Sequence, residues 1–121
     1  YDLIFSSGVF HHIDKEARLP AIKELEKKKK KGGRIFVFEH NPINPFTRTV
    51  VKDCVFDVGV ELIFAGSFKK LFDSIGFGKT RISYTLFFPR YKIFKCLFFL
   101  EKYFVRIPFG AQYFLEAKKF S

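Results

Sequence analysis

Residues 29–48 read KKKGGRIFVFEHNPINPFTR, and this stretch decides the fold that we predict. Lysines followed by Gly32-Gly33 are typical of a helix C-terminus, where unpaired carbonyls favour cations and glycine turns the chain. The apolar run Arg34–Glu39 then indicates a strand. His40–Pro45, with two prolines and two asparagines, predicts a loop at the carboxyl end of that strand.

The residues before this stretch predict another strand and a helix. Tyr1–Ser7 (YDLIFSS) is an apolar run that ends in small residues, as expected of a strand buried on both faces. Asp14 is expected to cap a helix that continues to about Lys30, in which Pro20 requires a late first turn or a bend. Strand, helix and strand with short loops predict a right-handed βαβ unit with a parallel strand pair.

The residues after it predict two helices and two strands. A weak pattern over Thr47–Phe56 favours a short helix, and Ser67 is expected to cap a clearer helix that ends at Gly76. Alternation and many β-branched and aromatic residues predict strands at Lys79–Phe88 and Gln112–Lys118.

Composition indicates a folded chain of one-domain size. It has 121 residues, 48% hydrophobic and 28% charged, which does not suit a disordered tail. Cys54 and Cys96 share no ligand spacing with the histidines, so we expect no metal and no disulfide scaffold. The sequence has neither a run of roughly 18 apolar residues nor a signal peptide before the first strand, so we expect a cytoplasmic location. Because it begins at Tyr1 and lacks Met, we interpret it as a fragment.

The net charge is +10, which favours acidic partners such as nucleic acid or anionic lipid. An AT-rich coding sequence explains the same bias, because Lys, Phe, Ile and Tyr are abundant whereas Trp and Met are absent. Both interpretations stay open, although we consider nucleic acid an unlikely partner because recognised RNA-binding signatures are absent.

Two stretches resemble one known family. Residues 1–13 (YDLIFSSGVFHHI) resemble the fourth strand and following loop of class I S-adenosylmethionine-dependent methyltransferases, and residues 29–48 resemble the glycine turn and fifth strand of that family. Ser67–Phe77 and the two last predicted strands are similar to its remaining elements, in the same order. One departure is Lys31, which stands where the family usually has proline.

The resemblance implies an α/β fold, namely the C-terminal half of a three-layer Rossmann-like methyltransferase sheet. The parallel βαβ unit is followed by the last two strands, the final one antiparallel. Residues 1–121 would then be a partial domain that lacks the glycine-rich cofactor motif of the first half. The implied cofactor is S-adenosylmethionine, which the fragment alone would bind weakly or not at all. Its first strand would be a bare apolar edge.

Ligands of open α/β sheets bind beyond the carboxyl ends of the parallel strands. There the resemblance places Ser7, Gly8 and Val9 under the methionine end of the cofactor, the alternative being an ordinary strand-to-helix turn. We expect His12 to be the catalytic residue, as a general base, and His11 to cap or pack the following helix.

Glu39, His40 and Asn41 follow the second strand and are expected to hold the substrate or orient a base. The alternative is loop closure through local backbone bonds. Methyl transfer needs mainly alignment, because the sulfonium already activates the methyl group. The expected function is methyl transfer to a small-molecule or lipid-like substrate. The alternative is a non-catalytic remnant or a basic module that binds membrane or nucleic acid.

Residues 90–109 mix Phe and Tyr with Lys and Arg, as membrane-surface helices do. We expect a helix from Tyr91 to about Phe104. The segment is interpreted either as a peripheral membrane contact or as an insertion that packs on the sheet and covers the substrate.

Overall fold

The computed structural model describes residues 1–53, 61–85, 103–104, 106–108 and 110–118. The chain alternates strands and helices before it ends in two strands. In order, the elements are β1 (Leu3–Ser7), the 3-10 turn η1 (Phe10–His12), α1 (Lys15–Lys28), β2 (Arg34–His40), α2 (Pro45–Asp53), α3 (Ala65–Asp73), β3 (Lys79–Thr85) and β4 (Gln112–Lys118).

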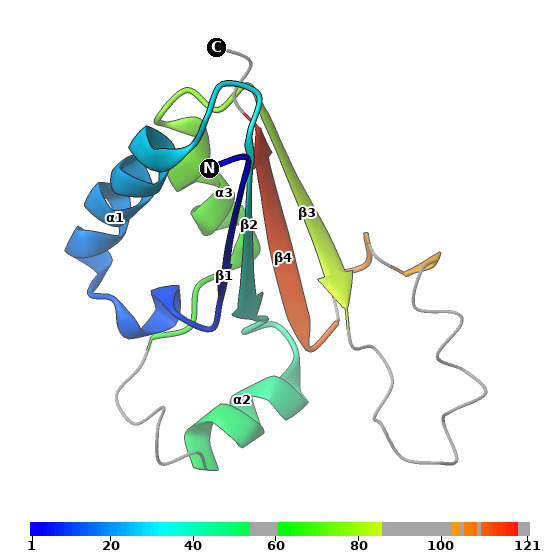
Figure 1. Cartoon of the computed structure of the whole chain (residues 1–121). Coiled ribbons are helices and arrows are strands. Elements are labelled where there is room, and N and C mark those ends of the chain that lie inside the picture. The colour runs from blue at the N-terminus through cyan, green and yellow to red at the C-terminus, as the bar shows by residue number, and fades with distance from the viewer. Residues whose placement is uncertain (54–60, 86–102, 105, 109, 119–121) are drawn as a thin grey trace.

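The strands form one sheet in the order β1-β2-β4-β3 (Figure 1). β1 and β2 are parallel, and β4 is antiparallel to both of its neighbours. The predicted βαβ unit and the antiparallel final strand are therefore confirmed. β1 lies at the edge of the sheet, as the resemblance implied.

One face of the sheet is covered by α1 and α3 (Figure 1). The hydrophobic core lies between these two helices and the sheet. Ile35 and Val37 alternate along β2 with residues of the other face, so both point into this core. Burying such side chains stabilises the fold by roughly 1.5–3 kcal/mol each. The core is formed by Phe10, Ile22, Ile35, Val37, Ile63, Ala65, Phe68, Phe72, Phe77, Tyr113, Leu115 and Ala117.

The opposite face, called the open face below, carries no helix among the described residues. Its aromatic side chains form one cluster, in which the ring centroid of Phe38 lies 5.3 Å from that of Phe5 and 5.0 Å from that of Phe114. On β1, Leu3 is 60% and Phe5 is 64% exposed. The expectation that the first strand is buried on both faces is therefore wrong, because β1 is an edge strand covered on one face only.

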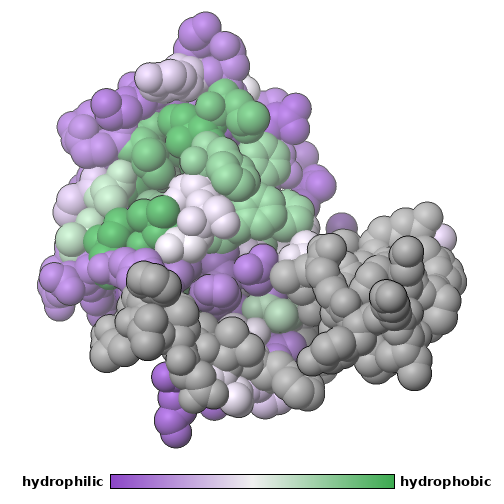
Figure 2. Space-filling view, turned by 60° about the horizontal axis from the view of Figure 1, so that its bottom comes forward, coloured by the Kyte–Doolittle hydropathy of each residue, from purple (hydrophilic) through white to green (hydrophobic). Residues whose placement is uncertain are grey.

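Figure 2 views the molecule from the side where β1 and β2 end, and it shows hydrophobic residues gathered in one broad area within a hydrophilic rim. Monomeric soluble proteins rarely expose large contiguous apolar areas.

The predicted turn between α1 and β2 is confirmed. Gly32 has φ +77°, a left-handed conformation that glycine adopts without strain. A Cβ on Gly33 would lie 3.0 Å from the carbonyl oxygens of Lys30 and Tyr1, so a larger residue would crowd the backbone at this turn. The Lys30 amide donates to the same Tyr1 oxygen at 2.8 Å, which joins the turn to the beginning of β1.

Several predicted boundaries need correction. The third helix begins at Ala65, two residues before the expected cap Ser67, because Phe64 occupies its N-cap position. Asp14 stands at the N-cap of α1 but makes no capping hydrogen bond through its side chain. α1 ends at Lys28 and contains Pro20.

Three predictions extend beyond the described residues. The short helix predicted over Thr47–Phe56 is present as α2, which begins at Pro45 and is described as far as Asp53. The third strand is described as far as Thr85, so its predicted end at 86–88 is outside them, as is most of the predicted helix over 91–104. No helix in the described part of the chain is long and apolar enough to cross a membrane.

Candidate active site

The loops that follow β1 and β2 begin side by side at the carboxyl end of the parallel pair. Ser7 is in register with Phe38, and the Gly8 amide donates to the Phe38 carbonyl oxygen at 2.9 Å. Gly8 then turns the chain with φ +65°. A Cβ there would meet only the His11 ring, at an ordinary 3.7 Å, so the backbone angle and not lack of space favours glycine.

The carboxylate of Glu39 joins the two loops. Its Oε1 accepts a hydrogen bond from the Phe10 amide at 2.8 Å, and its Oε2 lies 2.7 Å from His11 Nδ1. Glu39 and His11 are only 2% and 3% exposed. An isolated buried carboxylate would be costly, and the amide and the imidazole together remove that cost. Glu39 thereby fixes the turn after β1 to the end of β2.

Three imidazole rings lie close together at this end of the sheet. The His11 ring centroid lies 4.2 Å from that of His12 and 5.2 Å from that of His40. His11 is buried, His40 is partly buried and His12 is exposed. In the described part of the chain, no three His, Cys, Asp or Glu side chains are arranged to hold a metal ion. Of the three histidines, His12 is the most accessible to solvent.

Asn41 closes the loop after β2 onto the segment before β4. Its side-chain amide donates to the carbonyl oxygens of Pro108 at 2.8 Å and Gly110 at 2.7 Å, and its Oδ1 accepts from the Ile43 amide at 3.2 Å. Asn41 is 1% exposed. The Ile43 contact is the local backbone bond of the loop-closure alternative, whereas the bonds to Pro108 and Gly110 join a distant segment. A substrate contact for Asn41 stays a prediction.

Arg18 supports the same turn from α1 and was not singled out in the sequence. Its Nε donates to the carbonyl oxygens of Phe10 at 3.2 Å and Ile13 at 3.0 Å, and a terminal nitrogen donates to that of Glu61 at 3.2 Å. The one available signal is its position four residues before Ile22, which places it on the buried side of the helix.

Tyr113 is the second buried polar group that sequence reasoning missed. It lies opposite Glu39 in the β2–β4 register, and its hydroxyl donates to the Ile63 carbonyl oxygen at 2.8 Å. Burial raises the pKa of this phenol far above its usual value, and the nearby Glu39 carboxylate raises it further. Tyr113 is therefore a neutral hydrogen-bond donor that ties β4 to the segment before α3.

The residues expected at the cofactor lie on the rim of this site. Ser7 and Val9 are exposed, and Gly8 between them is partly buried. A positive-φ glycine flanked by exposed residues leaves backbone groups accessible to a ligand. A contact of Ser7, Gly8 and Val9 with one end of a small molecule stays a prediction. The three residues lie at the end of β1 and in the link to η1, where the Phe10 amide and the His11 ring contact Glu39.

No protein-family model matches this chain, and no curated protein sequence matches it. Solved structures do match. An S-adenosylmethionine-dependent methyltransferase from Archaeoglobus fulgidus aligns with a TM-score of 0.73 and 17% identity, over 98% of this chain and 59% of its own length. A possible histamine N-methyltransferase from Thermotoga maritima aligns with a TM-score of 0.71 and 19% identity, over 98% and 55%.

The chain therefore has the fold of class I S-adenosylmethionine-dependent methyltransferases, as a partial Rossmann-like α/β sheet. It spans a little over half the length of these two structures.

Proposed function

We propose that this chain supplies the acceptor side of a site for S-adenosylmethionine-dependent methyl transfer to a small-molecule or lipid-like substrate. The observation that carries the proposal is the buried Glu39 carboxylate, which joins the loops after β1 and β2 where ligands of such sheets bind. Preorganised loops suit a reaction whose rate depends mainly on alignment.

Ser7, Gly8 and Val9 would hold the methionine end of the cofactor. S-adenosylmethionine, when bound, supplies a methyl group that its sulfonium has already activated. We propose that the remaining cofactor contacts come from protein outside residues 1–121, because this chain spans 59% and 55% of the two similar structures. The isolated chain would then bind the cofactor weakly.

His12 would take the proton from the acceptor group. It follows the buried His11, which Glu39 holds at 2.7 Å, so the backbone that carries His12 is fixed while its ring is exposed. Glu39 and His11 are positioning residues in this scheme. His40, partly buried beside His11, would line the acceptor side.

Cofactor binding tests the proposal without knowledge of the acceptor. S-adenosylmethionine is titrated by calorimetry into this chain and into the chain extended upstream of Tyr1, with Gly8→Ala in each. We expect tight binding by the extended form and about tenfold weaker binding after Gly8→Ala, since a residue other than glycine is strained at the positive φ of this turn. Gly66→Ala on α3 is the matched control, because a Cβ there meets nothing within 4 Å.

Lack of binding by both forms would overturn the proposal and favour a non-catalytic basic module. If Gly66→Ala weakens binding as much as Gly8→Ala does, the cofactor does not bind at the Gly8 turn. Once an acceptor is found, His12→Gln is expected to slow single-turnover transfer by about 10²-fold or more while S-adenosylmethionine binding is kept.

We also propose a peripheral membrane contact through residues 90–109. The described part of this segment supports it, because Tyr103 and Ile107 are exposed apolar side chains beside the exposed Arg106. Sedimentation with anionic vesicles, with and without Tyr103→Ser, tests this contact.

A further inference from the structure

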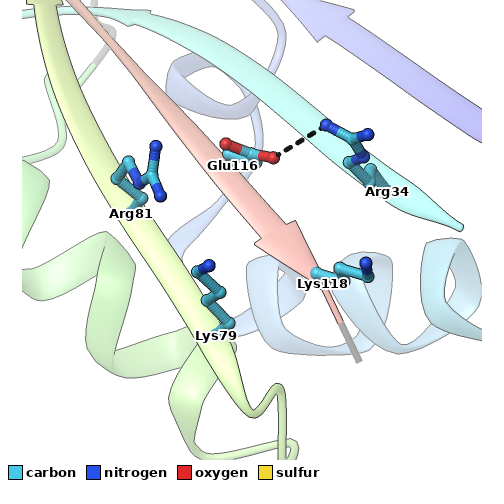
Figure 3. Close-up of a pocket in the computed structure, with 5 residues that line it drawn as sticks. All are labelled: Arg34, Lys79, Arg81, Glu116 and Lys118. Atoms are coloured by element: carbon cyan, nitrogen blue, oxygen red, sulfur yellow. Dashed lines mark hydrogen bonds and ion pairs between the residues drawn. The ribbon is translucent and has the colours of Figure 1, made fainter. Parts of the chain in front are cut away.

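A basic hollow lies on the open face, at the opposite end of β2 from the candidate active site. It has a volume of about 280 Å³ and is lined by Arg34, Lys79, Arg81, Glu116 and Lys118 (Figure 3). Arg34 begins β2 and His40 ends it, so roughly 20 Å of strand separates the hollow from the loops that Glu39 joins. The two sites are therefore distinct.

The strand register places three cations in one row. Arg34 is opposite Lys118 across β2 and β4, and Lys118 is opposite Lys79 across β4 and β3. Side chains directly opposite each other lie on the same face, and like charges in such pairs destabilise a sheet. The fold thus places three positive charges side by side at some cost.

The next row adds one more cation and the single acidic group of the hollow. Arg81 is opposite Glu116, whose carboxylate lies 3.4 Å from an Arg34 guanidinium nitrogen. Figure 3 shows this carboxylate between the basic side chains of the neighbouring strands. Four cations and one carboxylate leave an excess of three positive charges. Among the described residues, Lys79, Arg81 and Lys118 have no acidic partner.

The chemistry of these side chains suits phosphate. A guanidinium binds phosphate oxygens through two parallel hydrogen bonds, and lysine ammonium groups add compact positive charge. A phosphate monoester or pyrophosphate carries enough negative charge to offset the row, which a single carboxylate such as Glu116 does not. We infer that this hollow is a binding site for a phosphate-bearing anion, either a soluble phosphate compound or the headgroup of an anionic lipid.

Two probes distinguish these sources. Inorganic pyrophosphate is titrated into the purified protein by calorimetry, and vesicles of phosphatidylcholine with phosphatidic acid are compared with pure phosphatidylcholine vesicles by sedimentation. The test variant is Lys79→Gln with Lys118→Gln, which removes two charges from the row. The matched control is Lys23→Gln with Lys70→Gln, which removes two exposed charges from the helices that cover the other face.

We expect the test variant to weaken binding by about tenfold or more and the control by less than about twofold, since charge-assisted hydrogen bonds are lost only in the former. Glu116→Gln is expected to tighten binding severalfold, because it removes the one repelling charge. Loss of structure alone would not produce such a gain. Circular dichroism of each variant checks that the fold is kept.

Pyrophosphate binding with this pattern identifies a soluble phosphate ligand, and the same pattern with vesicles alone identifies a lipid headgroup. The inference is overturned if neither probe binds, or if both double variants weaken binding equally, which would indicate only a diffuse basic surface. Preferential binding of polyglutamate over both phosphate probes would also overturn it, in favour of an acidic polypeptide.

Discussion

The two faces of the sheet are built from the same strands and differ in what covers them. On the face under α1 and α3, Ile35, Val37 and Leu115 are fully buried. On the open face, Phe5 of β1 and Phe38 of β2 alternate with the buried residues of their strands and form an exposed or half-buried cluster. β2 is apolar on both faces, which is typical of a strand made to be covered twice.

Polar groups follow the same division. Under the helices, Glu39 and Tyr113 are hydrogen-bonded, and no buried side-chain nitrogen or oxygen in the described residues lacks a partner. On the open face, Arg34, Lys118 and Lys79 share one row with a single nearby carboxylate. Burial makes an unpaired polar group expensive, whereas water tolerates it. The sheet can therefore carry unpaired charges on the open face, which no described helix covers, but not on the face buried under α1 and α3.

The largest expected effect on the free energy of unfolding comes from comparing a phenylalanine on the covered side of the sheet with one on the open face. Phe72→Ala removes a fully buried ring under the sheet and should lower the free energy of unfolding by about 3–5 kcal/mol. Phe5→Ala removes a ring that is 64% exposed and should cost about 1 kcal/mol or less. Urea unfolding measures both. Equal losses would mean that the open face is covered in solution.

A second comparison uses two carboxylates on opposite faces. Glu39→Gln replaces the buried acceptor of the Phe10 amide and the His11 ring, and it should cost about 2 kcal/mol. Glu116→Gln removes a partly exposed carboxylate 3.4 Å from Arg34 and should cost less than about 1 kcal/mol. If the two losses measured by urea unfolding are alike, the Glu39 bridge does not hold the loops together as described.

Burial of Tyr113 on the covered face predicts that the stability of the protein depends on pH in the alkaline range. Its pKa is raised by burial, so the folded state holds this proton more tightly than the unfolded state. The stabilisation is complete below the ordinary tyrosine value of 10.0 and is lost as the pH rises above it, by up to about 1.4 kcal/mol per pH unit. Tyr113→Phe should flatten the decline in stability above pH 10, at a cost of about 1 kcal/mol near neutral pH.

Tyr84→Phe is the companion variant. Burial alone raises the pKa of Tyr84, which is only partly buried, so the effect on the alkaline limb should be smaller. Thermal unfolding from pH 7 to 11 gives both curves. An unchanged alkaline limb in Tyr113→Phe would show that this phenol does not control it.

Local patterns in the sequence were sufficient to predict most of the fold. The glycine turn at Gly32-Gly33 and the strand Gln112–Lys118 stand where predicted, because turn geometry and alternation depend on neighbouring residues. The position of Glu39 at the end of a strand followed from the same logic. The cap expected at Ser67 was wrong, because the apolar period does not show which residue begins a helix.

Contacts between distant segments were not predictable in this way. Arg18 and Tyr113 look like ordinary members of a helix and a strand, yet they bond to carbonyl groups 43 and 50 residues away. The pairing of His11 with Glu39 spans 28 residues and depends on how two loops meet in space. A single sequence shows which face a residue occupies but not what lies above that face.

The smallest expected effect on stability comes from Asp73, whose exposed pair with Lys69 can be compared with the buried pair of Glu39 and His11. Asp73 lies 2.7 Å from Lys69, the same distance that separates Glu39 from His11, but both side chains of the surface pair are 41% exposed. The hydrogen bond from Lys69 lowers the pKa of Asp73 below its usual 3.8, and Thr80 adds to this. A carboxyl with a lowered folded pKa stabilises the protein above its unfolded pKa, and this stabilisation is lost as the pH falls below about 4.

Asp73→Asn should therefore cost only about 0.3–0.5 kcal/mol near pH 7 and less near pH 3, because the stabilisation by this carboxyl declines as the pH falls. Asp14→Asn is the control, because its side chain makes no capping hydrogen bond. Urea unfolding at the two pH values measures the difference. A loss as large as that of Glu39→Gln would show that contact distance, and not cover by the helices, determines the strength of these pairs.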